Sequence, residues 1–96
     1  MNRKPTHPGE VLREDVLPAL GLSVSSFARG IGISRSLAHN ILKGEKPITP
    51  YVALKIAKFT GTSAGLWARM QLNHDLWVKE REEADALENI ITHHAA

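Results

Sequence analysis

Apolar residues along this chain recur at the spacing of an α-helix, and no stretch alternates in the manner of a β-strand. A first helix is expected over residues 9–20, where Pro18 should kink or end it and Gly21 should stop it. A second helix is expected over residues 24–31, because Ser23 is a good N-cap. Its apolar positions fall at i, i+3, i+4 and i+7, at Val24, Phe27, Ala28 and Ile31.

Three further helices are expected from the same signals. One follows the capping residue Ser34 and should end at Gly44. The next covers residues 50–60, where the cap Thr49 and Pro50 at the first helical position are a strong helix start. A last helix begins at Ser63 and carries large apolar residues at Leu66, Trp67, Met70, Leu76 and Trp77. The sequence leaves open whether this helix continues past Asn73. The pattern therefore predicts an all-α chain of about five helices.

Residues 24–42 meet the requirements of a helix-turn-helix unit. Two short helices meet at Gly32 with a connection of about three residues, so they must cross at a steep angle. Close crossing needs a small residue in the first helix, which Ala28 supplies, and a turn residue that tolerates φ > 0, which Gly32 supplies. Ala38 and Ile41 form the inner side of the second helix. Together these four residues predict the motif.

The inner side of the second helix determines which residues its outer side presents. A DNA major groove offers guanine acceptors that match an arginine fork and adenine edges that match an asparagine amide. We therefore expect bases to be read by Arg35, Ser36, His39 and Asn40. The competing interpretation is a polar helix face in contact with water only. Leu37 is either exposed toward a thymine methyl or turned inward by a slight rotation of the helix.

DNA phosphates are expected to lie on both sides of this helix. Helix N-termini offer amide N–H groups to an anion, and lysines after the second helix could grip the neighbouring backbone. The candidate residues are Ser23, Ser25, Ser34, Lys43, Lys46 and Thr49. Each could instead be only a helix cap or a solvated lysine, and Ser23 is a cap first of all.

The charge distribution is consistent with a polyanionic partner for the first part of the chain. Residues 1–72 hold ten basic and four acidic residues, a net charge of +6, whereas residues 73–96 hold two basic and six acidic residues, a net charge of −4. Ordinary uneven surface charge would give the same counts. We expect a flexible arm over 1–8, a DNA-binding domain over 9–72 and an acidic helical extension over 73–96.

The composition argues against several other classes of protein. The 96 residues include no cysteine, which excludes disulfides and thiolate metal sites and fits a reducing compartment. Neither a signal peptide nor a membrane span of about 20 apolar residues is present, so a cytoplasmic protein is expected. We expect no enzyme, because there is no catalytic triad pattern or HExxH motif. No cofactor or metal is expected, since the histidines share no ligand spacing beyond the pair His93 and His94.

Three segments carry a resemblance to a known family: HPGE near the start, ILKGEKPIT in the middle, and GTSAGLW followed by QLNHDLW near the end. With them, residues 7–82 resemble the HigA antitoxin family, also called VapI-like, within the XRE/Cro-type helix-turn-helix proteins. More distant members of the wider group usually lack both ends of this pattern. The resemblance implies a five-helix, lambda-repressor-like DNA-binding domain with a C-terminal helical extension.

The resemblance also implies partners. Proteins of this kind are typically homodimers that bind a palindromic operator, repress their own operon and neutralise a RelE-like toxin that cleaves mRNA. Their dimer contacts tend to lie in the C-terminal helices, which points here to Leu66, Trp67, Met70 and Trp77. These residues could alternatively complete the core of a single chain. Two other functions stay open, an orphan regulator without a toxin and a protein-interaction module with little affinity for DNA.

Overall fold

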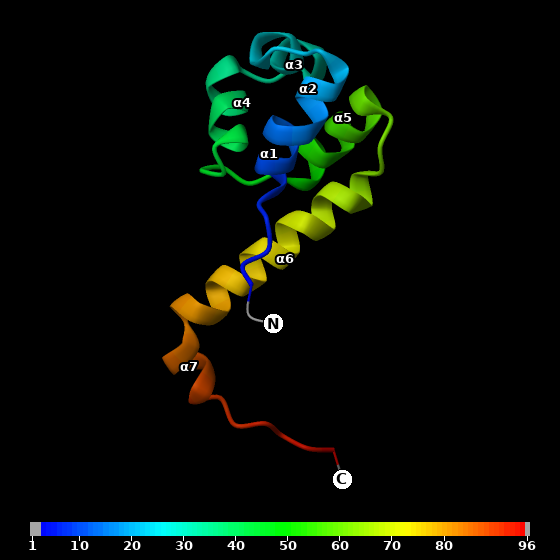
Figure 1. Ribbon diagram of the computed structural model, residues 1–96. Coiled ribbons are helices and arrows are strands. Elements are labelled where there is room, and N and C mark those ends of the chain that lie inside the picture. Colours follow the sequence, from blue (N-terminus) through cyan, green and yellow to red (C-terminus); the bar gives the residue numbers. More distant parts are fainter. Residues whose placement is uncertain (1–2, 96) are drawn as a thin grey trace.

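The computed structural model describes residues 3–95, which fold into helices joined by short turns (Figure 1). The elements in chain order are α1 (Pro8–Val11), the π-helical turn η1 (Leu12–Val16), α2 (Leu17–Leu20), α3 (Val24–Ile31), α4 (Arg35–Leu42), α5 (Pro50–Thr60), α6 (Ala64–Glu82) and α7 (Ala84–Glu88). Because α1, η1 and α2 are continuous, they form the single first helix that the sequence predicts. The all-α prediction is confirmed, and α7 adds a short element after the five expected helices.

The first helix passes its proline by means of the π turn. The N–H of Leu17 bonds to the carbonyl of Leu12, five residues back instead of four. This wide turn comes immediately before Pro18, whose ring in a regular α-helix would clash with the carbonyl four residues earlier. The expected disruption at the proline therefore takes the form of a π turn, and the helix ends at Gly21.

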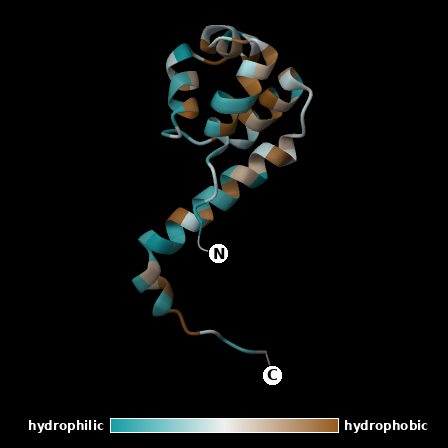
Figure 2. Cartoon of the chain, viewed as in Figure 1, coloured by the Kyte–Doolittle hydropathy of each residue, from teal (hydrophilic) through white to brown (hydrophobic). Residues whose placement is uncertain are grey.

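The hydrophobic core lies between the first helix, α3, α4, α5 and the first turns of α6. In Figure 2 the hydrophobic segments gather in this helical body, while the part of α6 beyond it is more hydrophilic. The buried apolar residues are Leu12, Leu17, Phe27, Ala28, Ile31, Ala38, Ile41, Leu42, Ile48, Val52, Ala53, Ile56 and Trp67. Every helix from α3 to α6 thus contributes to one core.

A glycine allows α3 and α5 to approach each other closely. Glycine inside a helix costs up to about 1 kcal/mol relative to alanine. At Gly30, however, a Cβ atom would collide with the ring of Phe59. The same ring packs at 6.4 Å, centre to centre, from the ring of Phe27 in the core. The lost helix propensity at Gly30 is therefore offset by close packing between the two helices.

Helix α6 belongs partly to the body and partly extends beyond it. Trp67 and Gln71 are buried in the body, and the helix continues without a break to Glu82 (Figure 1). The domain boundary expected between residues 72 and 73 therefore falls inside one helix. The expected flexible arm over residues 1–8 does not extend to its last two residues, since His7 is buried and caps α1, which begins at Pro8. Residues 1–2 of this arm lie outside the described part of the chain. Among the helices of residues 3–95, none combines the length and apolar character that crossing a membrane requires.

Candidate nucleic-acid interface

The junction between α3 and α4 has the geometry of a helix-turn-helix unit. Gly32 ends α3 in the left-handed conformation, with φ of 71°. The N–H of Ile33 then donates to the carbonyl of Ala28 at 3.0 Å. The side chain of Ser34 accepts the N–H of Leu37, also at 3.0 Å, and so opens α4. The turn between the two helices is therefore fixed at both ends by hydrogen bonds.

Packing fixes the rotation of α4 about its axis. Ala38 and Ile41 are fully buried, and Ala28 in α3 is 3% exposed where the two helices cross. Leu42 is buried as well, and Leu37 is half-buried against the core. The structure therefore supports the alternative in which Leu37 turns toward the core. With this rotation fixed, α4 can present only one side to a partner.

The side of α4 opposite the core is polar. Arg35, Ser36 and His39 are exposed, while Asn40 is half-buried at the edge of this surface, next to Leu37. The surface therefore offers a guanidinium, a hydroxyl and an imidazole within little more than one helical turn, and an amide at its margin. The guanidinium can only donate hydrogen bonds to base edges, whereas the hydroxyl, the imidazole and the amide can both donate and accept them.

Three of the six candidate phosphate contacts are helix caps. The side chain of Ser23 accepts the N–H of Ser26 at 3.1 Å and donates to the hydroxyl of the same residue at 3.0 Å. Ser34 caps α4, and the side chain of Thr49 accepts the N–H of Val52 at 3.3 Å. Both a lone pair and the proton of the Ser23 hydroxyl are thus in use within the chain. Ser25, in the first turn of α3, is half-buried.

The two candidate lysines lie in a loop that folds back on the end of α4. The backbone N–H groups of Glu45 and Lys46 both donate to the carbonyl of Asn40, at 2.9 and 3.2 Å. Lys43 and Lys46 are exposed. Farther along, the side chain of Ile48 enters the core and is 3% exposed. The segment from 43 to 49, here called the α4–α5 loop, is therefore an ordered part of the body.

The contacts from the first helix to the end of α4 were not predicted from the sequence. The guanidinium of Arg13 donates to the carbonyl of Leu42 at 2.9 Å. One turn earlier, Gly9 lies so close to the carbonyl of Ile41 that a Cβ atom would collide with it. The glycine of the HPGE segment is the one sequence feature that could have indicated this approach.

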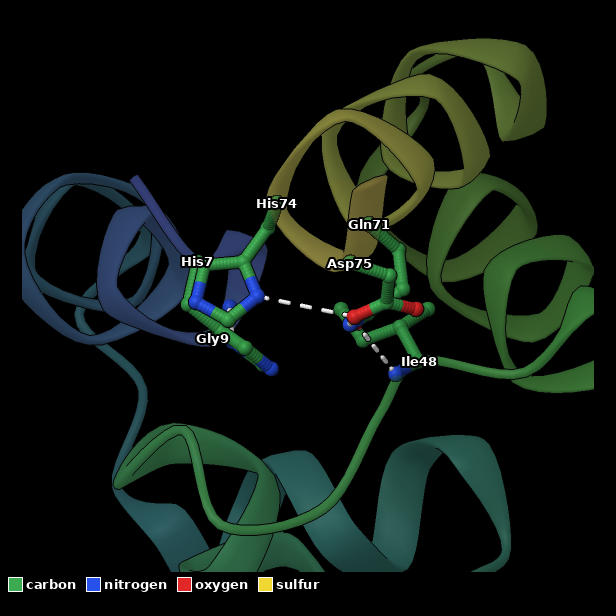
Figure 3. Close-up of polar contacts among 6 residues, drawn as sticks. All are labelled: His7, Gly9, Ile48, Gln71, His74 and Asp75. Carbon is green, nitrogen blue, oxygen red and sulfur yellow. Dashed lines mark hydrogen bonds and ion pairs between the residues drawn. The ribbon is translucent and has the colours of Figure 1, made fainter. Parts of the chain in front are cut away.

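A polar cluster joins the start of the chain to α6 (Figure 3). Nδ1 of His7 accepts the N–H of Gly9 at 2.9 Å, and the ring of His7 meets that of His74 edge to face, 4.9 Å between centres. Gln71 donates through Nε2 to Oδ1 of Asp75 at 2.9 Å, and Nδ1 of His74 lies 3.5 Å from the same oxygen. Burial, and next the nearby His74, lower the pKa of His7 from its ordinary value of 6.5. Within residues 3–95, no three or more histidines, aspartates or glutamates are grouped as metal ligands would be.

The four residues expected in a dimer contact do not share one environment. Trp67 is 1% exposed, and its indole N–H donates to the hydroxyl of Thr62 at 2.8 Å. The expected dimer contact at Trp67 is therefore wrong, because docking of α6 places this side chain inside the core of a single chain. Met70 and Trp77 are half-buried, and only Leu66 is largely exposed, at 42%.

Known proteins share this arrangement. A helix-turn-helix family model matches residues 12–67. An HTH-type transcriptional regulator of Haemophilus influenzae, itself uncharacterized, is 37% identical over 83 residues, which are 86% of this chain and 78% of that protein. Antitoxin HigA-1 of Vibrio cholerae is 31% identical over 75 residues, 78% of this chain and 70% of that protein. The sequence likeness therefore extends beyond the motif.

Solved structures agree over nearly the whole length. An addiction module antidote protein of the HigA family from Coxiella burnetii superposes with a TM-score of 0.85 and 29% identity, covering 96% of this chain and 100% of that one. Pseudomonas aeruginosa antitoxin HigA, solved with the higBA promoter, gives 0.86 and 25% identity over 95% of this chain and 99% of that one. The chain therefore belongs to the helix-turn-helix family, as a transcription regulator of the group that includes the HigA antitoxins.

Proposed function

We propose that this protein binds operator DNA through α4 and represses the transcription of its own operon. The observation that carries the proposal is the fixed rotation of α4, which buries Ala38 and Ile41 and leaves Arg35, Ser36 and His39 exposed. The likeness to an antitoxin solved together with its promoter supports operator DNA as the partner.

Each polar residue of α4 has a role in this proposal. Arg35 donates as a fork to O6 and N7 of a guanine, and Ser36 and His39 bond to neighbouring base edges. Asn40, at the half-buried edge of the surface, reads an adenine with its amide. These contacts provide the sequence preference, while phosphate contacts provide most of the salt-dependent affinity.

Phosphate contacts are proposed on both sides of α4. Lys43 and Lys46 reach the backbone from the α4–α5 loop, where both side chains are exposed. Ser25, Ser34 and Thr49 can donate their hydroxyl protons to a phosphate. The hydroxyl of Ser23 already donates its proton to Ser26. Ser23 therefore contributes to phosphate binding only by capping α3, whose N-terminal N–H groups favour an anion.

The active form is proposed to be a homodimer with two-fold symmetry. Two copies of α4 would then occupy successive major grooves of a palindromic operator, about 34 Å apart. Leu66, Met70 and Trp77 stay candidates for the contact between the copies. Helix α6 also exposes Leu72 and Leu76, which lie on a different side of the helix from these three residues.

A RelE-like toxin is the proposed second partner. The likeness to HigA antitoxins supports it, and the acidic segment after residue 73 has the charge that complements a basic protein. The alternative is an orphan regulator without a toxin. A small basic RelE-like reading frame beside the gene, whose product binds this chain on co-expression, would decide for the antitoxin. The family consists of DNA-binding regulators, and no catalytic role is proposed.

Selection from a random DNA library tests the proposal directly. The purified protein is presented with duplexes of about 30 random base pairs, long enough for two half-sites about 10 base pairs apart. We expect an enriched palindrome, whose affinity falls steeply with salt because several phosphates are neutralised. Binding without sequence enrichment, or affinity that does not change with salt, would reject the proposal in favour of a protein-interaction module.

A further inference from the structure

The α4–α5 loop is attached to α6 by one side chain. The backbone N–H of Ile48 donates to Oε1 of Gln71 at 2.7 Å, across 23 residues of sequence (Figure 3). Gln71 is 6% exposed and Ile48 is 3% exposed, so this bond is shielded from water. A buried N–H without an acceptor is costly, and Gln71 therefore determines where this part of the loop can lie.

Gln71 is itself held in one orientation. Its Nε2 donates to Oδ1 of Asp75, one turn farther along α6, at 2.9 Å. An amide side chain can present either its oxygen or its nitrogen to a neighbour. The carboxylate of Asp75 accepts only from the nitrogen, so it directs the oxygen of Gln71 toward the loop.

The loop is gripped on its other side by the start of the chain. At Gly44, the position of a Cβ atom lies 3.5 Å from the ring of His7, which is ordinary packing distance. The loop is therefore enclosed between His7 before α1 and Gln71 on α6. Along the chain, the exposed Lys46 lies between these two supports, and the exposed Lys43 directly precedes the first of them.

We propose that Gln71 is a positioning residue for DNA binding, which holds the α4–α5 loop so that Lys43 and Lys46 reach phosphates. The proposal rests on the function proposed above and names a residue that does not touch DNA. Loss of the bond to Ile48 loosens the loop at its α5 end, whereas its α4 end keeps the bonds to the carbonyl of Asn40, and α4 stays fixed by Ala38 and Ile41 in the core. Phosphate binding is then weakened and base reading is retained.

The test is the salt dependence of operator affinity in Gln71→Met, which keeps the size of the side chain and removes both hydrogen bonds. We expect the slope of log K against log salt to flatten by about 0.9 for each phosphate that is no longer neutralised. The preference for the selected duplex over a scrambled one should be unchanged. The control is Asn73→Met, which also replaces a side-chain amide by methionine, at an exposed position of α6, and should keep the parent slope.

A double-mutant cycle separates positioning from general loss of stability. In a background of Lys43→Ala and Lys46→Ala, Gln71→Met should flatten the slope no further, because the lysines that it positions are already absent. Equal flattening in both backgrounds, or a parent-like slope in Gln71→Met alone, overturns the proposal. A parent protein without salt-dependent DNA binding would instead reject the proposed function, so the two failures are distinguishable.

Variants at Asp75 keep the test decisive if Gln71→Met does not fold. Asp75→Asn and Asp75→Ser remove the same charge, but only the asparagine oxygen still reaches Nε2 of Gln71. We expect a flatter slope for the serine variant than for the asparagine variant. Identical slopes would contradict the proposal. The exchange of Gln71→Glu with Asp75→Asn retains an acceptor for Ile48 and the net charge, and should restore the parent slope.

Discussion

Arg13 in the first helix donates to the carbonyl of Leu42, the last residue of α4, across 29 residues of sequence. The carbonyls at a helix C-terminus lack intrahelical partners and carry partial negative charge. A guanidinium there stabilises the helix both as a hydrogen-bond donor and as a positive charge. With Gly9 beneath the carbonyl of Ile41, the first helix supports the end of α4. The helix proposed to read DNA is thus held by a segment that lies far from it in sequence.

Replacing Arg13→Met should lower the free energy of unfolding by about 1 kcal/mol, because the carbonyl of Leu42 loses a charged donor. The measurement is urea unfolding followed by circular dichroism. Arg69→Met, at an exposed position of α6, is the control and should have a smaller effect. Equal losses in the two variants would show that the bond to α4 contributes nothing measurable.

Two glycine-to-alanine variants should change stability in opposite directions. In Gly9→Ala the new Cβ collides with a backbone carbonyl of α4, which cannot move cheaply, so we expect a loss of about 1–3 kcal/mol. In Gly65→Ala the one close approach of the Cβ is to the end of the Arg69 side chain, which can swing aside, and the hydroxyl of Ser63 lies at ordinary contact distance. Alanine then gains up to about 1 kcal/mol of helix propensity. Thermal unfolding of both variants against the parent checks the two signs.

Arg35→Ala should weaken operator binding by about 1–3 kcal/mol and relax the base preference at one position. The guanidinium is exposed on the outer side of α4, so its loss leaves the core unchanged. Lys46→Ala should instead weaken binding to all duplexes similarly. Fluorescence anisotropy with duplexes that differ at single positions measures both effects. An Arg35→Ala variant with parent affinity and preference would show that α4 meets DNA with another side.

His7 should make the fold less stable in mild acid. Burial and the nearby His74 lower its pKa, Lys4 adds to the lowering, and Asp75 and Glu10 act in the opposite direction. As the pH falls, the unfolded chain binds a proton at about 6.5, before the folded chain does. The stabilisation by neutral His7 is therefore complete above the unfolded value and is lost as the pH falls through the folded value.

Urea midpoints of the parent and of His7→Asn, compared from about pH 8 to about pH 5, isolate this contribution. Asparagine keeps an acceptor at the N-cap of α1 but does not titrate over this range. The parent should lose more stability than the variant toward acid. Parallel profiles would mean that His7 titrates alike in the folded and the unfolded chain.

The sequence predicts those features of the fold that depend on local signals. The capping residues Ser23, Ser34 and Thr49 and the positive φ at Gly32 lie where the helices begin and turn. Such signals act within a few residues, so they can be read without knowing the rest of the chain. The inner side of α4 follows from the same periodicity, which is why its exposed residues could be named in advance.

Contacts between distant segments could not be predicted in this way. Nothing near Gln71 indicates that it accepts the N–H of Ile48, because that bond exists only once α6 has docked on the body. The prediction that Trp67 lies in a dimer contact was wrong for a related reason. Apolar side chains look alike in sequence whether they fill a core or an interface, and only the packing of α6 assigns this one to the core.

The continuity of α6 sets a limit on how this protein can be divided. Trp67 and Gln71 belong to the body, and the same helix runs on to Glu82. A truncation after residue 72 would cut the helix one residue beyond Gln71, its last buried residue, and leave a frayed end beneath the α4–α5 loop. In a chimera that takes its C-terminal segment from a relative, the two sequences should therefore be joined beyond Val78. There the helix has left the body and its side chains are exposed.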